Sequence, residues 1–243
     1  MSSDIVKELI AKTMQELSTP PAPKQRSRVW KHPQGYRYLV QWSNAVLLRF
    51  LIRLLTNSLP KSEYRRKAQL DDAGRSTVRN LEEGYKRSTT SEYLDFIGFS
   101  QGSLEEDKGD IRELTEDGFL RSQPGSSLGD IGIDLGDLNK ALSPKGNLEE
   151  IKGGLQERPG QKKPNPDSDK IFLYRPLTTI YPPLSKVRAE HLTYEIFIEL
   201  INKTDFLLRK LVESLERKLS IDQKYYQVER ARIRDKFRKF RKR

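Results

Sequence analysis

Cysteine is absent from the 243-residue chain, and histidine occurs only twice, as His32 and His191. Without cysteine there is no disulfide scaffold, thiolate zinc site, iron–sulfur cluster or cysteine nucleophile. Neither histidine stands three residues after a glutamate, as di-metal enzymes built on helix bundles require, because Val29 and Arg188 occupy those positions. We therefore expect no metal and no other cofactor, and we interpret His191 as a surface residue.

Long apolar runs are also missing. The longest apolar stretch, residues 45–55, is interrupted by Arg49 and Arg53 and is shorter than the roughly 20 residues that a membrane-spanning helix needs. The N-terminal residues lack the apolar core and small residues of a secretory signal. Hydrophobic residues make up 35% of the chain and charged residues 33%, which suits one modest core with polar appendages. We expect a soluble, cytoplasmic protein.

Sequence motifs of common enzymes are missing as well. The chain contains neither the Gly-x-x-x-x-Gly-Lys-Ser/Thr phosphate loop nor the Gly-x-Ser-x-Gly nucleophile motif. Glycines and aspartates alternate over residues 129–137 without the spacing of a calcium loop, so we interpret this run as part of a flexible insertion. The acidic runs 82–83 and 105–107 are interpreted as helix faces or oligomer contacts. We expect a protein that is not an enzyme.

The positive charge is concentrated in two segments. Residues 228–243 contain nine lysines and arginines against two acids, and residues 18–37 contain five and no acid, so the remainder is close to neutral although the net charge is +11. Segregated positive charge is typical of proteins that bind polyanions. The predicted nucleic-acid-binding residues are Arg230, Arg232, Arg234, Lys236, Arg238, Lys239, Arg241, Lys242, Arg243, Lys24, Arg26, Arg28 and Lys31. Two alternatives stay open: the tail only keeps a helical oligomer in solution, or it contacts an acidic protein or membrane surface.

Apolar residues at helical spacing predict four substantial helices. They are expected over residues 36–58, 62–85, 89–118 and 186–219. The third begins with a capping box formed by Thr89 and Glu92. Ser185 is the expected N-cap of the fourth helix and Ser220 is expected to interrupt it. Asp222 would then cap a last helix that carries the basic tail.

Between the third and fourth helices the composition changes. Residues 121–169 contain eight glycines and five prolines, which favours a long irregular insertion with one short helix over residues 131–142. The predicted fold is therefore all-α: an antiparallel four-helix bundle with a long irregular insertion before the last long helix and a basic C-terminal helical tail. The expected divisions are an N-terminal short helix with a basic linker (1–34), three bundle helices (35–120), the insertion (121–185), and the fourth helix with its basic suffix (186–243).

The second and third predicted helices contain a motif that consists of Asn80-Leu81-Glu82-Glu83-Gly84-Tyr85, Phe96 and Gly102-Ser103-Leu104-Glu105-Glu106. Gly84 is expected to provide the left-handed backbone of a helix C-cap. Arg75 and Asn80 are expected to form buried polar links between helices. Gly102 and Ser103 are small enough to let a neighbouring helix approach closely. The structural motif residues are therefore Arg75, Asn80, Glu83, Gly84, Gly102 and Ser103.

Together with its flanking residues, this motif resembles the four-helix bundle protein family. That family includes proteins encoded within intervening sequences of bacterial large-subunit ribosomal RNA and the accessory variability determinant of diversity-generating retroelements. The resemblance rests on the motif and on Gln69-Leu70, Ala73, Arg75-Ser76, Arg87 and Glu92. It covers residues 35–120, and the chain from about His191 onward is similar to the suffix helix of longer members. The chain departs from the family pattern at Gly98 and Asp107, where apolar residues are usual.

The resemblance implies a bacterial accessory protein that assembles into ring-like oligomers with a basic surface, five copies being the favoured number. Its implied partner is a reverse transcriptase or another nucleic-acid enzyme. Because the chain shows no signature of base-specific readout, we predict binding to RNA or DNA with low sequence specificity and no membrane partner. The alternative hypothesis is a protein–protein or self-assembly module whose basic tail docks on an acidic partner.

Four aromatic residues lie among or near the tail cations. They are Tyr225, Tyr226, Phe237 and Phe240. Aromatic side chains beside cations can stack on the bases of single-stranded nucleic acid. The same residues can instead pack as the apolar face of a last helix, an interpretation that we favour for Phe237 and Phe240 because they are three residues apart.

Overall fold

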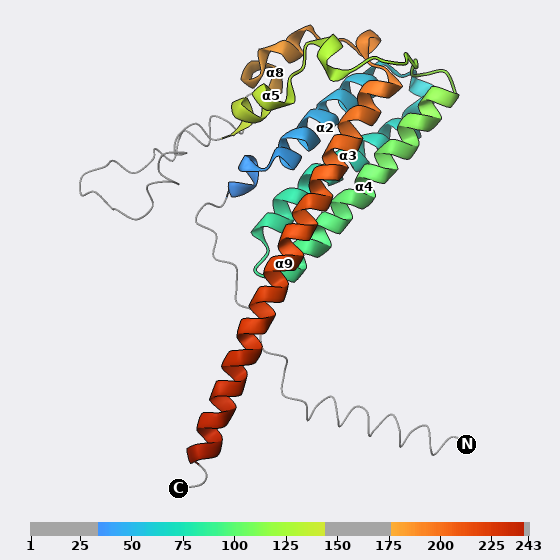
Figure 1. The fold of residues 1–243 in the computed structure, drawn as a ribbon. Coiled ribbons are helices and arrows are strands. Elements are labelled where there is room, and N and C mark those ends of the chain that lie inside the picture. The colour runs from blue at the N-terminus through green and yellow to red at the C-terminus, as the bar shows by residue number, and fades with distance from the viewer. Residues whose placement is uncertain (1–33, 144–175, 241–243) are drawn as a thin grey trace, which may run out of the picture.

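The computed structural model describes residues 34–143 and 176–240. Every regular element in these two stretches is helical (Figure 1). The four long helices are α2 (Val40–Ser58), α3 (Tyr64–Lys86), α4 (Thr90–Glu116) and α9 (Tyr194–Phe240). The short helices and 3-10 turns are η1 (Gly35–Tyr38), η2 (Lys61–Glu63), η3 (Leu128–Ile131), α5 (Leu135–Leu142), α8 (Leu177–Ile180), η4 (Pro182–Lys186) and η5 (Ala189–His191).

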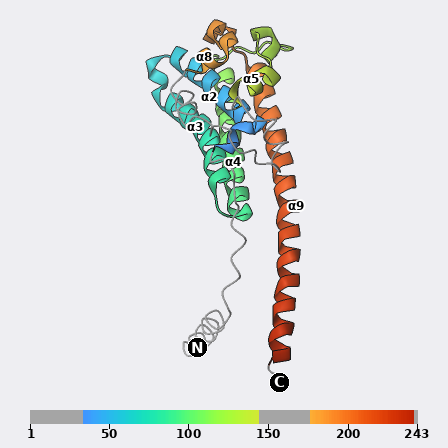
Figure 2. The same ribbon diagram turned by 90° about the vertical axis from the view of Figure 1, so that its left-hand side faces the viewer.

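The long helices form the predicted antiparallel four-helix bundle. Each packs against two others, in the order α2, α3, α4, α9 and back to α2. Successive helices run in opposite directions (Figures 1 and 2). Their apolar faces meet in one continuous core along the bundle. Its largest fully buried side chains include Leu47, Leu51, Leu81, Ile97, Ile111 and Phe197.

Both ends of α4 follow the prediction. At its start, the Thr89 hydroxyl accepts the Glu92 N–H at 3.1 Å, and the Glu92 carboxylate accepts the Thr89 N–H at 3.2 Å. The hydrogen bond from the Thr89 hydroxyl is the largest cause that lowers the pKa of Glu92. At its end, Gly118 has a φ of +79°, and the Phe119 N–H donates to the Leu114 carbonyl oxygen at 2.9 Å. This arrangement is the Schellman termination that glycine favours.

The last long helix begins eight residues later than predicted, at Tyr194. Ser185 does not cap it, because the Ser185 hydroxyl donates to the Pro182 carbonyl oxygen at 2.7 Å within a 3-10 turn. Thr193 takes the capping position instead, and its hydroxyl oxygen accepts the Ile196 N–H at 3.3 Å. The predicted start at residue 186 is therefore wrong.

The predicted break at Ser220 is also wrong. α9 continues through this residue, and the Ser220 hydroxyl donates to the Arg217 carbonyl oxygen at 2.8 Å. A serine can make this bond without leaving the helix. Asp222 consequently lies inside α9 and does not begin a new helix.

α9 divides into two halves. Residues 194–215, the bundled half, pack against α2 and α4, and Leu215 is the last described residue with a buried side chain. α9 then continues past the ends of the other described helices (Figures 1 and 2), and we call its residues 216–240, which follow Leu215, the projecting half. At 1.5 Å per residue the projecting half is about 38 Å long.

The first part of the predicted insertion is folded. α5 contacts α2, and it begins at Asp134, whose carboxylate accepts the Asp137 N–H at 2.8 Å. Gly132, with a φ of +72°, turns the chain into this cap. The alternating glycines and aspartates therefore form turns and caps, and their interpretation as flexible is wrong. The buried side chains that this segment adds to the core are Leu128, Ile133, Leu138 and Leu142.

Two further findings concern the described residues alone. None of their helices is long and apolar enough to cross a membrane. No group of three or more histidine, aspartate or glutamate side chains among them is arranged to hold a metal ion.

Candidate nucleic-acid interface

The predicted tail cations are carried by the projecting half of α9. Those on the helix are Arg230, Arg232, Arg234, Lys236, Arg238 and Lys239. Because successive residues are about 100° apart around an α-helix, the helix positions of Arg230, Arg234 and Arg238 lie along one side of the axis, and those of Arg232, Lys236 and Lys239 lie along the opposite side. Outside the described residues lie Arg241, Lys242, Arg243, Lys24, Arg26, Arg28 and Lys31, which stay predictions.

The aromatic positions of the tail share this location. Tyr225, Tyr226, Phe237 and Phe240 all belong to the projecting half. Figures 1 and 2 show that the other described helices end before these turns of α9. Both interpretations of these aromatic side chains, stacking on bases and packing, stay predictions.

Gly84 of the sequence motif lies inside α3 and not at its end. Its φ is not positive, and α3 continues to Lys86. The predicted C-cap is therefore wrong. A Cβ atom on Gly84 would lie 2.6 Å from the Phe96 Cβ and 2.9 Å from the Tyr93 Cδ2. The glycine is required because α3 and α4 approach each other closely at this point.

The other motif residues have mixed outcomes. Arg75 is exposed, so the predicted buried polar link is wrong for this residue, and Asn80 is half-buried. A Cβ atom on Gly102 would meet nothing within 4 Å, so no helix of the described chain approaches there. The Ser103 hydroxyl donates to the Phe99 carbonyl oxygen at 3.1 Å, within its own helix. Close approach is therefore wrong at Gly102 within the described chain, and at Ser103 it stays a prediction.

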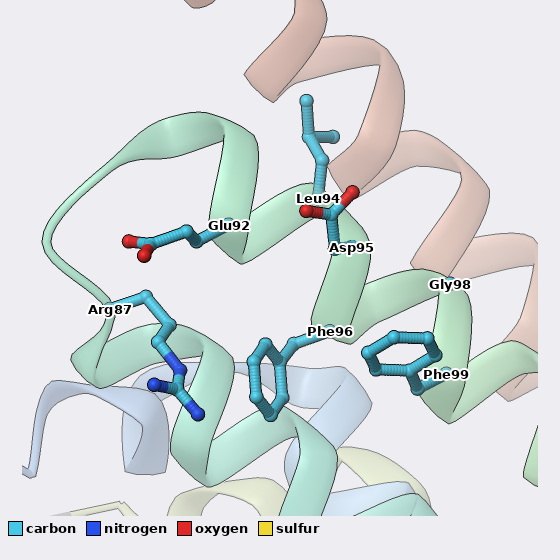
Figure 3. A pocket seen from close by; sticks show the side chains of 7 residues that line it. All are labelled: Arg87, Glu92, Leu94, Asp95, Phe96, Gly98 and Phe99. Carbon is cyan, nitrogen blue, oxygen red and sulfur yellow. The ribbon is translucent and has the colours of Figure 1, made fainter. Parts of the chain in front are cut away.

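A shallow pocket with two aromatic rings lies where α3 leads into α4 (Figure 3). The Arg87 guanidinium carbon is 4.2 Å from the Phe96 ring centroid, and the Phe96 and Phe99 rings meet edge to face at 5.6 Å. Phe99 remains 59% exposed. Two carboxylates also line the pocket, and a third, Glu83, pairs with Arg87 at 3.7 Å. These carboxylates make the pocket unsuited to a phosphate.

Two contacts fix the alignment of α2 and α3. Near one end, the Arg53 guanidinium pairs with the Asp71 carboxylate at 2.9 Å. Near the other, the Trp42 Nε1–H donates to the Glu82 Oε1 at 3.1 Å. The contacts are eleven residues apart on both helices, so the antiparallel register between them is continuous.

This register places Arg49 of α2 opposite Arg75 of α3. A Cβ atom on Gly74 would lie 3.7 Å from the Arg49 Cα, which confirms the close approach of the two helices. Arg53 and Arg79 each follow one helical turn later on their own helices. We call these four residues the arginine cluster.

The arginine cluster is short of negative charge. Arg53 and Arg79 each have a carboxylate partner, and the Arg79–Glu82 distance is 3.0 Å. Arg49 and Arg75 form no ion pair within the described residues. The pKa of Arg49 is lowered, first by partial burial and then by the positive charges of the other three arginines, and the negative charge of Glu82 opposes this lowering. Positive charge therefore accumulates where α2 meets α3.

This cluster was not predicted, although the sequence contains one signal of it. Arg49 and Arg53 lie one helical turn apart within the apolar run of the first predicted helix. From the sequence they were interpreted only as interruptions of that run. The near-neutral charge of the body also conceals the cluster, because acidic residues elsewhere balance it in the total.

Asp107 on α4 is fully buried, and its carboxyl oxygens have no hydrogen-bond donor among the described residues. Its interpretation as part of an acidic helix face is wrong. Burial raises the pKa of Asp107 to about 8, and the charges of Asp110 and Glu106 act in the same direction. Thr77 opposes this rise in the pKa, but its hydroxyl donates to the Ala73 carbonyl oxygen at 3.1 Å. Asp107 is therefore largely a neutral core residue at pH 7.

Comparison with known families gives one match. Residues 37–133 match the family model described as 23S rRNA-intervening sequence protein. The match extends from η1 through α2, α3 and α4 to η3, and it confirms the resemblance that the motif predicts. It does not include α9. No curated protein and no solved structure gives a match to the chain.

Proposed function

We propose that this chain is a non-enzymatic, oligomeric four-helix bundle protein that binds RNA or DNA through basic surfaces. The observation that carries the proposal is the position of the tail cations on a helix that extends about 38 Å beyond the bundle. Cations held there can contact a polyanion without obstruction by the bundle. Recognition would depend on charge and shape and not on base sequence. The proposed location is the cytoplasm.

The family resemblance supports the assembly part of this proposal. By that resemblance the oligomer is a ring, with five copies favoured, and it assists a reverse transcriptase or another nucleic-acid enzyme. Two features of α4 suit contact with a second copy: Gly98 and Gly102 leave open space on the helix surface, and Phe99 beside them is exposed.

The proposal is tested by measuring binding to short labelled RNA and DNA over a series of salt concentrations. If six tail cations neutralise phosphates of a single strand, a plot of log affinity against log salt concentration has a slope of about −4. A chain that ends at Gln227 keeps the bundled half of α9 and should lose most of this affinity. Its oligomeric mass, measured in the same buffers, should equal that of the full chain. Absence of binding by the full chain at low salt would contradict the proposal.

The alternative is a protein–protein or self-assembly module whose tail docks on an acidic partner. The exposed Phe99 favours it, since an apolar ring at the surface suits a protein contact. A plain polyanion such as heparin competes for the tail in both functions, so the distinguishing result is what stays bound. Heparin should displace nucleic acid completely in the proposed function, whereas in the alternative a protein partner should stay attached through the apolar contact at Phe99.

A further inference from the structure

We propose that the arginine cluster is a phosphodiester-binding site on the bundle itself, separate from the basic tail. This inference rests on the proposed function, to which it adds a second contact surface. The site consists of Arg49, Arg53, Arg75 and Arg79, two from each of two neighbouring helices. Its ligand is the sugar–phosphate backbone of a nucleic-acid strand.

The geometry of the cluster suits a strand of regularly spaced anions. Arg49 and Arg53 are four residues apart on α2, and Arg75 and Arg79 are four residues apart on α3, which gives a rise of about 6 Å along each helix. The register places Arg49 opposite Arg75, so these two residues form the centre of the cluster. Because α2 and α3 are antiparallel, Arg53 lies beyond one side of this centre and Arg79 lies beyond the other. A strand that follows the groove between α2 and α3 can therefore meet successive cations.

Two of the four cations in the cluster lack a carboxylate partner in the described part of the chain. Asp71 and Glu82 pair with Arg53 and Arg79, and the central pair, Arg49 and Arg75, forms no ion pair among the described residues. Like charges held this close weaken the fold until an anion relieves them. Guanidinium groups bind phosphate oxygens through two parallel hydrogen bonds, which makes phosphate the matching anion.

The cations are also accessible. The side chains of Arg53 and Arg79 are 59% and 62% exposed, and Arg49 and Arg75 belong to the exposed residues of their helices. Even a paired arginine at an exposed position contributes little to the stability of a fold. The two central residues are therefore better explained by a ligand than by the stability of the bundle.

The test compares the full-length wild-type chain with the double variant Arg49→Gln, Arg75→Gln. Both are titrated with a labelled single-stranded oligouridylate over a series of salt concentrations. Loss of two phosphate contacts should lower the affinity about tenfold or more near 0.1 M salt and reduce the steepness of the salt dependence by about 1.4. The thermal midpoint of the free double variant should be equal to or higher than that of the wild type, because repulsion is removed.

A matched control removes the same charge from another surface. In the variant Arg112→Gln, Arg209→Gln, two exposed arginines that pair with Glu116 and Asp205 are replaced. Its affinity should stay within about threefold of the wild type. If the double cluster variant does not fold, the single variant Arg75→Gln replaces it, with a loss of affinity of about threefold or more and a change in steepness of about 0.7.

The possible results distinguish failure of this inference from failure of the proposed function. If the wild type binds the strand and the cluster variant binds it equally well with the same salt dependence, the cluster is not a phosphate site, and the proposed function of the tail stands. If the wild type does not bind, both proposals fall. If the cluster variant loses oligomeric mass together with affinity, the cluster is instead a contact between copies, and the inference is overturned.

Discussion

The two halves of α9 belong to one continuous helix but are supported in different ways. The bundled half contributes six buried apolar side chains to the core: Ile196, Phe197, Leu200, Ile201, Leu208 and Leu215. The projecting half carries Arg230, Arg232, Arg234, Lys236, Arg238 and Lys239 and extends past the other described helices (Figure 2). Tertiary packing supports the first half, whereas helix propensity and contacts between successive turns support the second.

Because of this difference, we expect the bundled half to determine the stability of the domain and the projecting half to determine binding. Changes in the bundled half should alter the free energy of unfolding of the whole domain. Changes in the projecting half should alter binding and local helix content with little effect on that free energy. Substitutions in the two halves test this division, and one substitution in α4 tests the core of the bundle, in order of decreasing effect.

The largest effect is expected from truncating a core aromatic residue. Phe197→Ala should lower the free energy of unfolding by about 3–5 kcal/mol, because it leaves a cavity at a fully buried position. Phe237→Ala in the projecting half should change it by less than about 0.5 kcal/mol. Urea-induced unfolding followed by circular dichroism measures both. Similar losses for the two variants would show that the projecting half packs against the core or against another copy.

The next effect concerns the pH dependence of the core where α4 faces α3. The folded-state pKa of Asp107 is raised to about 8 from an ordinary value of 3.8, so the folded chain holds a proton that the unfolded chain releases. Stability is therefore lost as the pH rises from about 4 to about 8. Asp107→Asn should remove this loss and raise the free energy of unfolding at pH 8 by about 2–4 kcal/mol. At pH 4 the difference should nearly vanish, and equal differences at both pH values would contradict the burial of a neutral carboxyl group.

A smaller effect is expected at the first turn of the bundled half. Thr193→Ala removes the acceptor of the Ile196 N–H and a contact of 2.6 Å with the Ser126 hydroxyl. The free energy of unfolding should fall by about 1–2 kcal/mol. Thr193→Ser keeps the hydroxyl and should recover most of the loss. Thermal or urea unfolding of the two variants provides the comparison.

The smallest effect is expected near the start of the projecting half. Ser220→Ala should stabilise the local helix by about 0.5 kcal/mol, because alanine has the higher helix propensity. Hydrogen exchange of the amides from residue 216 to residue 227 should slow, while global unfolding stays unchanged. Ser220→Gly should act in the opposite direction. A change in the global unfolding midpoint would show that the two halves unfold together.

The sequence predicted the fold where apolar residues repeat at helical spacing over several turns. The capping box at Thr89 and the termination at Gly118 were also predicted correctly, because each depends on a few neighbouring residues. The start of α9 was not, because Ser185 and Thr193 are both suitable N-caps and the choice depends on contacts of residues 182–191 with the rest of the chain. The short helix predicted over residues 131–142 is present as α5. The turns before it escaped prediction because the buried residues of this segment are too far apart for one periodic face.

Only the part of the candidate site whose charged residues lie close together in the sequence could be predicted. The tail cations lie close together along the chain, so their number alone indicates a polyanion. The arginine cluster depends on the register between two helices, which places Arg49 opposite Arg75 although they are 26 residues apart. Asp107 shows a related limit. The family pattern has an apolar residue at this position, but the charged run around Asp107 by itself gives no indication that the side chain faces α3.

The uninterrupted course of α9 through Ser220 has a mechanical consequence. A helix without a hinge acts as a lever whose short arm is clamped in the bundle. A tilt of about 10° at the bundle end moves the tip, about 38 Å away, by about 7 Å. A strand held at the tip can therefore exert leverage on the packing of α9 against α2 and α4, and a small rearrangement of that packing becomes a large displacement of whatever the tip carries.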